Sequence, residues 1–478
     1  MKGLKAGLDR RSFLITGAML VGGVSAHELL RGATTRTVAG AASLPAFRTP
    51  DDRDDSAAFA RALQTGRPVF LPAGGGLGEN GAYLVDQIEL AGGAHVFGEG
   101  DRTVIRSLNR DVRHVFHAEG AGPQTPVRGI QLRSFRIDGR LLGAGFREHW
   151  NLIEFAGVED VVIEDVHFHG FMGDAIIFAG DSIGPQRAGP ITPRPNRGLI
   201  VRNCRFDGID RDNRNAISII DGTDVLVEGC IFENCSRQDM PGAIDIEPNP
   251  YPFYRIENIT IKDCSFTRCG GSNGSISLFV PPEVIAVPRG LQFIGNRFDS
   301  NLAADFYIHL GRHWEASDPS CGIRIAGSRG RAGNSPWRIL SAKGVEIDSD
   351  NVWTDYQAAT LLGYNFAQAH VRDFADEATY VRVGRGGPPA QFGISVFNVT
   401  NARFSGRFVD CGDGSPDSAA LAFINDGASG VTLSNARFSA PSRRTAYAVR
   451  AFSGLSQAQV RQFGNDFGGL ASDLPNRR

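Results

Sequence analysis

The 478-residue sequence has few lysines, few methionines and almost no net charge. Only four of its 50 basic residues are lysine (Lys2, Lys5, Lys262 and Lys343), and 52 acidic residues bring the formal charge to −2. A charge this balanced does not favour nucleic-acid binding. Beyond residue 26 no apolar run approaches 18 residues, so no membrane-spanning helix is predicted. The 42% hydrophobic content and 59 scattered glycines exclude a disordered chain, a collagen and a coiled coil.

The first 26 residues have the pattern of an export signal. Basic residues precede an apolar run from Phe13 to Ala26, which is too short to span a bilayer and has the length of a signal-peptide core. The stretch DRRSFL at 9–14 resembles a twin-arginine (Tat) signal, and the alternative is a chance arginine pair before an apolar anchor. We expect a signal peptide and spacer over residues 1–45, and a periplasmic or secreted protein without membrane contact after signal removal.

The seven cysteines are predicted to be free, although disulfides are common in exported proteins. Cys204, Cys230 and Cys264 each stand two residues before a phenylalanine, and Cys235 and Cys269 follow the second and third of these by five residues. Cysteines at equivalent places of a stacked repeat lie about 4.8 Å apart, which is wider than the Cβ separation of a disulfide. We expect buried thiols in the core.

A motif of the form apolar-x-apolar-x-x-(Cys/Asn/Val/Ser)-x-Phe recurs along most of the chain. Its aromatic positions are Phe135, Phe168, Phe206, Phe232, Phe266, Phe298, Phe404, Phe438 and Phe467, with Trp353 in the same place of another copy. Short alternating β-branched segments and turn residues surround each copy. A second segment follows each phenylalanine by 8–12 residues. Its aligned apolar positions, predicted to face inward, are 176, 217, 244, 276 and 306, and 178, 219, 246, 278 and 308.

No long helical pattern separates these strands, which excludes βαβ units. We predict an all-β, single-stranded right-handed parallel β-helix of about 12 rungs, capped by an amphipathic helix over residues 55–63. The order of DDSAAFARAL, VFLPAGG, AYLV and GEGDRTVI within residues 54–105 closely resembles the amino-terminal part of pectate-lyase-like (pectin-lyase superfamily) proteins. The resemblance covers residues 50–310 well and 340–470 weakly. It implies one β-helix domain over 46–478, to which we add a loop insertion around 311–337.

The resemblance leaves the activity open, because that superfamily includes lyases, hydrolases, epimerases and phage tailspikes. With 244 and 246 facing inward, Asp245 and Glu247 point outward with Cα atoms about 6.5–7 Å apart. Tyr307 and His309 are their outward neighbours further along the stack, with Asp305 as a substrate-binding candidate. Two carboxylates flanking a glycosidic bond can serve as general acid and as base or nucleophile. We therefore predict a glycoside hydrolase with catalytic Asp245 and Glu247; the alternative is that both are solvated strand residues or bind a cation.

The turns before these strands carry the remaining candidates for substrate binding. Arg211, Arg214 and Arg237 are suited to uronate carboxylates or sulfates, because guanidinium binds such groups with paired donors. Asn215 and Asp239 stand in the same turns. We predict an acidic polysaccharide or oligosaccharide as substrate; ordinary surface turn chemistry is the alternative for each residue.

The motifs that would fix the reaction are absent. We find no Asn-Thr-Asp with a paired Asp-Asp, no Asp-Pro-His-Asp and no Arg-x-Pro-x-x-Arg, which mark polygalacturonase-type hydrolases, mannuronan epimerases and calcium-dependent pectate lyases. A lyase or epimerase acting on a uronic-acid polymer through Tyr307 and His309 is thus the second hypothesis, and a non-catalytic glycan-binding β-helix the third. No cofactor or metal is predicted, while calcium and a homo-oligomer stay open. His167 and His169 flank Phe168 and are predicted to face outward on a different face, with weak support for a ligand role.

Overall fold

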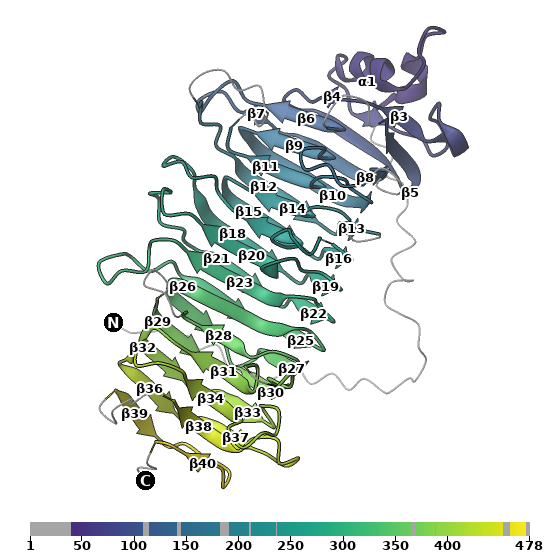
Figure 1. Ribbon diagram of the computed structural model, residues 1–478. Helices are drawn as coiled ribbons and strands as arrows, with labels where there is room; N and C mark the ends of the chain where they lie inside the picture. Colours follow the sequence, from purple (N-terminus) through teal and green to yellow (C-terminus); the bar gives the residue numbers. More distant parts are fainter. Residues whose placement is uncertain are drawn as a thin grey trace, which may run out of the picture. The chain divides into compact units, whose positions relative to one another are not determined.

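The computed structural model describes residues 40–474 except 109–113, 141–144, 182–190, 210–211, 236, 365–369, 388 and 453–458. The predicted export signal lies outside the described residues. The described chain is mostly β and forms a single parallel β-solenoid of about 13 turns with one short α-helix (Figure 1). This confirms the predicted fold class.

A turn of the solenoid contains up to three strands, and we call the stacks that they form face 1, face 2 and face 3 in chain order. Each strand pairs in parallel with the strand of the same face in the next turn, as β12, β13 and β14 do with β15, β16 and β17. Face 1 contains β1 (Ala42–Ser43), β2 (Val69–Phe70), β5 (His95–Ser107), β7 (Val127–Arg128), β8 (Gln131–Asp138), β10 (Val158–His169), β12 (Arg197–Arg202), β15 (Gly222–Glu228), β18 (Ile256–Lys262), β21 (Leu291–Ile294), β24 (Ile323–Ala326), the second half of β26 (Ser335–Ile347), β29 (Val371–Asp376), β32 (Val399–Phe404), β35 (Ala428–Ser429), β36 (Val431–Ser434) and β39 (Val460–Phe463).

Face 2 follows face 1 after a corner, and the long strands β5, β8 and β10 run through that corner into it. Its own strands are β3 (Tyr83–Val85), β13 (Arg205–Asp207), β16 (Ile231–Glu233), β19 (Ser265–Thr267), β22 (Arg297–Asp299), β25 (Arg329–Arg331), β27 (Val352–Tyr356), β30 (Thr379–Val383), β33 (Arg407–Val409) and β37 (Arg437–Ser439). Face 3 contains the first half of β26 and β4 (Ile88–Glu89), β6 (Phe116–Glu119), β9 (Ile153–Ala156), β11 (Ile176–Ala179), β14 (Ile217–Ile219), β17 (Ile244–Ile246), β20 (Gly274–Val280), β23 (Ala304–Leu310), β28 (Thr360–Leu362), β31 (Phe392–Val396), β34 (Ala419–Phe423), β38 (Tyr447–Ala451) and β40 (Ala471–Ser472).

The helix α1 (Ser56–Leu63) lies at one end of the stack, between the short 3₁₀ helices at Leu44–Phe47 and Glu79–Gly81 (Figure 1). Ala58, Phe59 and Ala62 on one side of α1 are fully buried. The Phe59 and Phe116 rings pack edge to face, with their centroids 6.1 Å apart. The helix therefore covers the end of the core as predicted. No helix among the described residues combines the length and apolarity needed to cross a membrane.

The corner between faces 1 and 2 requires a left-handed backbone in successive turns. The residues at this place include Asp165, Asn203, Gly229, Asp263, Gly295 and Gly327, whose φ angles lie between 53° and 67°. Only glycine adopts such angles without cost, and Asn and Asp tolerate them better than other residues. Much of the abundance of these residue types therefore serves one recurring corner.

The phenylalanine that follows this corner forms the predicted core ladder. Phe168, Phe206, Phe232, Phe266 and Phe298 stack with ring centroids 4.6–5.1 Å apart. Gly330 interrupts the ladder, which continues through Trp353, Tyr380, Phe408 and Phe438.

Two predicted members of the ladder are wrong. Phe135 aligns with Val166, so Ile137 takes the ladder place beside Phe168. Phe404 pairs with Asp376, whereas Phe408 occupies the ladder. Both errors follow from the two-residue side-chain period of a strand. A shift of two or four residues leaves a side chain directed into the core, even where it moves from face 1 to face 2 as between Phe404 and Phe408, so the sequence pattern does not distinguish the alternatives.

Two further predictions can be compared with the described structure. All seven cysteines are free and buried, as expected. The predicted loop insertion at 311–337 is wrong in its second part, because β24 and β25 lie there and continue faces 1 and 2. β1 at Ala42–Ser43 pairs with β2, so the solenoid begins slightly before the predicted boundary at residue 45.

Candidate functional site on face 3

The outer surface of face 3 carries the polar row that the repeat pattern predicts. Ile244 and Ile246 are fully buried in the core, and Asp245 between them faces the other way. In register, Ser218 precedes Asp245, and Ser277, Tyr307 and Arg338 follow it on β20, β23 and β26. Parallel strands lie about 4.8 Å apart, so these side chains form one continuous row.

Asp245 is much less accessible than predicted, because its neighbours cover it. The residue is 1% exposed, and its Oδ1 atom has no hydrogen-bond partner among the described residues. Burial raises the pKa of Asp245 well above its usual range, the charge of the neighbouring Glu247 adds to this, and Arg214 opposes it. The carboxyl of Asp245 therefore favours its protonated form, while Glu247 is only half-buried.

Asn215 connects Asp245 to the preceding turn. In the amide orientation that satisfies its neighbours, its nitrogen donates to the Gly242 carbonyl (2.8 Å), and its oxygen accepts from Ser218 Oγ (3.0 Å) and Arg214 Nη1 (3.3 Å). The same oxygen position lies 3.3 Å from Asp245 Oδ2. A protonated Asp245 can donate a hydrogen bond to it, whereas an ionised Asp245 would be repelled. Asn215 is itself fully buried, so it positions Asp245 from inside the protein and is not exposed to a substrate.

Arg214 is already paired within the chain. Its Nη1 donates to Asp174 Oδ2 at 2.6 Å, and the Asn215 backbone N–H donates to Asp174 Oδ1 at 3.1 Å. The charge of Asp174 raises the pKa of Arg214. The Arg214 side chain is 18% exposed, so it anchors the turn, and its predicted role in substrate binding stays a prediction.

Arg237 is also held by carboxylates of the chain. Its Nη1 donates to Asp212 Oδ1 (2.8 Å) and its Nε to Asp239 Oδ1 (2.9 Å), while its guanidinium lies 4.1 Å from the centre of the Phe146 ring. Asp212, Arg237 and Asp239 line an open hollow. Arg211 lies outside the described residues.

Tyr307, His309 and Arg338 are half-buried and share this surface. Tyr307 Oη lies 3.4 Å from His309 Nδ1. Burial raises the pKa of Tyr307, with Glu247 adding to the rise and Arg338 opposing it. Burial lowers the pKa of His309. At neutral pH the tyrosine is therefore a proton donor and the histidine a neutral base.

Asp305 does not lie on the exposed row, which corrects the prediction. It aligns with Ser275, two residues before the row position held by Ser277 and Tyr307, and is 0% exposed. The Tyr356 hydroxyl donates to Asp305 Oδ2 and Asn301 Nδ2 donates to its Oδ1 (3.2 Å). Burial raises the pKa of Asp305. Its position at the very start of β23 allows the side chain to bend towards Tyr356 of face 2, so Asp305 stabilises the corner.

The polar row contains a second group of residues that the sequence analysis missed. His114, His117 and Glu154 lie together at β6 and β9, with His114 Nδ1 3.0 Å from Glu154 Oε2 and His117 Nδ1 2.8 Å from Glu89 Oε2. Asn151 Nδ2 donates to Glu154 Oε2 (2.8 Å). The Asn151 Oδ1 atom accepts from the backbone N–H of Asp174 (2.9 Å), which connects this group to the Arg214 ion pair described above.

Arg338 was missed for a different reason. It stands between Trp337 and Ile339, both fully buried, so the apolar-x-apolar pattern of its strand could have placed it beside Tyr307. The predicted insertion ended at Trp337 and concealed this pattern. Arg338 Nη2 donates to Asn334 Oδ1 (3.1 Å), and among the described residues it forms no ion pair with a carboxylate.

No protein-family model and no curated protein matches the sequence. Among solved structures, the chain is similar to the N-terminal fragment of bacteriophage phi29 gene product 12, with 15% identity, a TM-score of 0.52, and coverage of 90% of this chain and 72% of that one. It spans 56% of the pre-mature form of the same phage protein, at a TM-score of 0.49.

Two carbohydrate-active enzymes also match. One is the catalytic unit of a GH87 alpha-1,3-glucanase from Streptomyces thermodiastaticus (13% identity, TM-score 0.44, covering 92% of this chain and 71% of that one). The other is the A-module of the Azotobacter vinelandii mannuronan C-5 epimerase AlgE4 (14% identity, TM-score 0.38, covering 91% and 97%). At these identities the comparisons show a shared parallel β-helix fold and nothing finer.

Proposed function

We propose that the chain is an exported polysaccharide-active enzyme that cleaves a uronic-acid-containing glycan by elimination at the outer surface of face 3. The observation that carries this proposal is the grouping of Tyr307, His309 and Arg338 on two neighbouring strands. Export rests on the twin-arginine-like start of the sequence. The grouping supplies a neutral base, a proton donor and a cation, which are the three components that β-elimination needs.

The reaction can be written with these groups in named roles. Arg338 pairs with the uronate carboxylate and stabilises the negative charge that develops when the adjacent C5–H bond breaks. His309 takes that proton, the electron pair forms the C4=C5 double bond, and the C4–O bond to the leaving sugar breaks. Tyr307 gives its proton to the leaving oxygen. No water is consumed, and the product carries an unsaturated uronate at its new non-reducing end.

Hydrolysis by Asp245 and Glu247 is the second candidate. The raised pKa of Asp245 beside Glu247 favours it, because an acid–base pair needs one protonated and one ionised carboxyl. The 1% exposure of Asp245 disfavours it, since both carboxyls must reach opposite sides of one glycosidic bond. Glu247 is the more accessible of the two and would make the direct contact.

Elimination and hydrolysis can be distinguished by their products. Purified protein incubated with a panel of acidic and neutral polysaccharides is expected to generate unsaturated uronate, detected by its ultraviolet absorbance. Tyr307→Phe should lower the rate by about 10²–10⁴-fold, the usual contribution of a positioned acid or base. Tyr447→Phe is the matched control, because Tyr447 lies on the same face at β38, several turns away.

Other outcomes exclude parts of the proposal. New reducing ends without absorbance, lost in Glu247→Gln, would replace elimination by hydrolysis. Full activity in both Tyr307→Phe and His309→Ala would remove the site assignment. Absence of cleavage across the panel, with binding of an acidic polymer intact, would favour a glycan-binding protein over an enzyme.

A further inference from the structure

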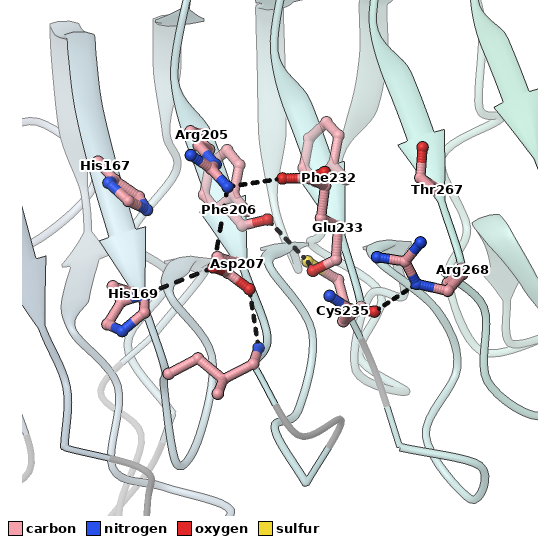
Figure 2. A network of polar contacts seen from close by, with 12 residues as sticks. His167, His169, Arg205, Phe206, Asp207, Phe232, Glu233, Cys235, Thr267 and Arg268 are labelled. Atoms are coloured by element: carbon pink, nitrogen blue, oxygen red, sulfur yellow. Dashed lines mark hydrogen bonds and ion pairs between the residues drawn. The ribbon is translucent and has the colours of Figure 1, made fainter.

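A second group of imidazoles and carboxylates lies on the outside of face 2, away from the polar row of face 3. His167 and His169 are two residues apart on β10 (Figure 2), and both point outward because Phe168 between them is buried in the core. Asp207 on β13 is the register partner of His169. One donor atom from each of His167, His169 and Asp207 lies within 4.8 Å of the other two.

One ring nitrogen of each histidine in this group is buried without a hydrogen-bond partner among the described residues. His167 Nε2 and His169 Nδ1 are both inaccessible to solvent, and neither has a hydrogen-bond partner among the described residues. Such atoms are costly in a folded protein unless something absent from the polypeptide satisfies them. Two of them beside a carboxylate point to a cation that accepts imidazole nitrogen.

The distance between His169 and Asp207 matches the distance between two ligands of one metal ion. His169 Nδ1 and Asp207 Oδ2 are 3.5 Å apart, which is long for a charged hydrogen bond. Two ligands of a tetrahedral zinc ion, at bond lengths of about 2.0–2.1 Å, are about 3.4 Å apart. The two atoms therefore already stand at the separation that a tetrahedral metal requires.

The outer contacts of the group also have the arrangement of a metal site. His167 Nδ1 lies 3.0 Å from Asp101 Oδ1, and an N–H donated to this carboxylate leaves Nε2 of the same ring with its lone pair free. Metal-binding histidines usually hold their second nitrogen in this way. Asp207 Oδ1 accepts the backbone N–H of Ile209 at 3.0 Å, which leaves Oδ2 for the metal.

The neighbouring arginines do not occupy the site. Arg205, next to His167 in register, directs its Nη2 to Glu233 Oε2 (2.9 Å), and the same nitrogen lies 4.0 Å from Asp207 Oδ2 (Figure 2). Arg136 is the other register neighbour of His167. Calcium and magnesium are bound by charge and by oxygen ligands, so the two arginines weaken their binding. Metals that are held by imidazole nitrogen are affected less.

The similar group on face 3 is a weaker candidate. The rings of His114 and His117 are nearly parallel, with centroids 4.9 Å apart and an angle of 18° between their planes, so their lone pairs do not readily converge on one ion. The rings of His167 and His169 are 75° apart, which allows convergence. Glu154 Oε2 lies 3.0 Å from His114 Nδ1, closer than the 3.5 Å between Asp207 Oδ2 and His169 Nδ1 and shorter than the separation of about 3.4 Å between two ligands of a tetrahedral ion.

We propose that His167, His169 and Asp207 bind a divalent transition-metal ion, with zinc as the ion that fits best. Two imidazoles and one carboxylate form a ligand set typical of zinc and of other borderline metals such as cobalt and nickel. Water takes the fourth position, since the side chains of His169 and Asp207 are 26% and 19% exposed. The ion connects β10 and β13 of two adjacent turns, and the contact of His167 with Asp101 extends across β8 to β5.

The test uses the full chain without an affinity tag, freed of metal by chelation and then dialysed. Zn²⁺ is titrated by calorimetry, and Co²⁺ is followed by its visible absorption, which reports tetrahedral coordination directly. We expect one equivalent of either metal to bind. His169→Ala and Asp207→Asn should weaken binding at least 100-fold, and Asp101→Asn about 10–100-fold, the usual effect of removing an outer carboxylate.

His117→Ala is the matched control, because it removes an imidazole from the other group and should leave binding unchanged. Each variant is checked by circular dichroism, and His169→Gln provides a second variant that keeps a polar side chain. Failure of the folded wild-type chain to bind either Zn²⁺ or Co²⁺ overturns the proposal. So does unchanged binding in both His169→Ala and Asp207→Asn, or loss of binding in His117→Ala. Equal competition by Ca²⁺ would overturn the assignment to an imidazole site.

Discussion

Removing one ring of the phenylalanine ladder is the sharpest test of what stabilises the solenoid. Phe232 is 0% exposed and stacks on Phe206 (4.8 Å, 2° between planes) and on Phe266 (4.6 Å, 2°). We expect Phe232→Ala to lower the free energy of unfolding by about 3–5 kcal/mol, the range for a buried phenylalanine truncated to alanine. Two lost ring contacts of about 0.5–1.5 kcal/mol each favour the upper half of that range.

The structure gives a reason why the cavity would remain open. β13, β16 and β19 are held in register by ladder hydrogen bonds on both sides of Phe232, so the neighbouring backbones cannot move together to fill the space. A cavity that does not collapse costs more than one that does. Phe232→Leu keeps most of the side-chain volume and should recover roughly half of the loss.

The measurement is urea unfolding followed by circular dichroism, with Phe463→Ala as the matched control. Phe463 is 58% exposed at the surface of β39, so the same chemical change should alter stability by less than about 0.5 kcal/mol. Because a solenoid can open locally, hydrogen exchange in β13 and β19 should rise together with the loss. Equal effects of Phe232→Ala and Phe463→Ala would refute the idea that the ladder stabilises the core.

Three further predictions follow from other buried groups. Burial raises the pKa of Asp221 to about 6, against an unfolded value near 3.8, so its contribution to stability is present at low pH and about 3 kcal/mol is lost as pH rises through 6. Asp221→Asn should therefore make the midpoint of urea unfolding depend less on pH between pH 4 and pH 8. The same pH dependence in the variant and the wild type would contradict this. Tyr356→Phe removes the hydroxyl that donates to the buried Asp305 and should destabilise the chain by about 1–3 kcal/mol, measured by the same urea assay with Tyr447→Phe for comparison. All seven thiols are buried and free, so a thiol reagent should react with none in the native protein and with seven in denaturant; fewer than seven without reductant would indicate a disulfide.

The fold was largely predictable because its determinants repeat. The spacing of Phe206, Phe232 and Phe266 predicted the ladder, and the alternation around Ile244 and Ile246 predicted which side chains face the core. Both rest on periodicity, which a strand expresses directly in the sequence. The errors at Phe135 and Phe404 arose where a two- or four-residue shift leaves the periodicity unchanged.

The site was less predictable, because exposure depends on residues far apart in the chain. The outward direction of Asp245 was predicted, but its burial depends on Asn215 and Arg214 in the preceding turn and on Glu247 beside it. The guanidiniums of Arg214 and Arg237 were expected to meet a substrate, and both instead have carboxylate partners within the chain. The sequence contains no local signal for such pairings, since they depend on how the turns between strands fold over the outer surface.

The left-handed corner between faces 1 and 2 has a consequence for tracing the ancestry of this chain. The ladder aromatic follows the corner at a constant distance, as in Asn203 and Phe206, Gly229 and Phe232, or Asp263 and Phe266. Glycine, asparagine and aspartate predominate at the corner, because other residues strain the backbone by about 1–2 kcal/mol; Ser134, three residues before Ile137, is an exception with a φ of 56°. Overall identity can therefore fall to the level of chance while the pairing of corner and ring survives. Genes that arose by duplication of single turns should retain this pairing as the mark by which their units can be counted.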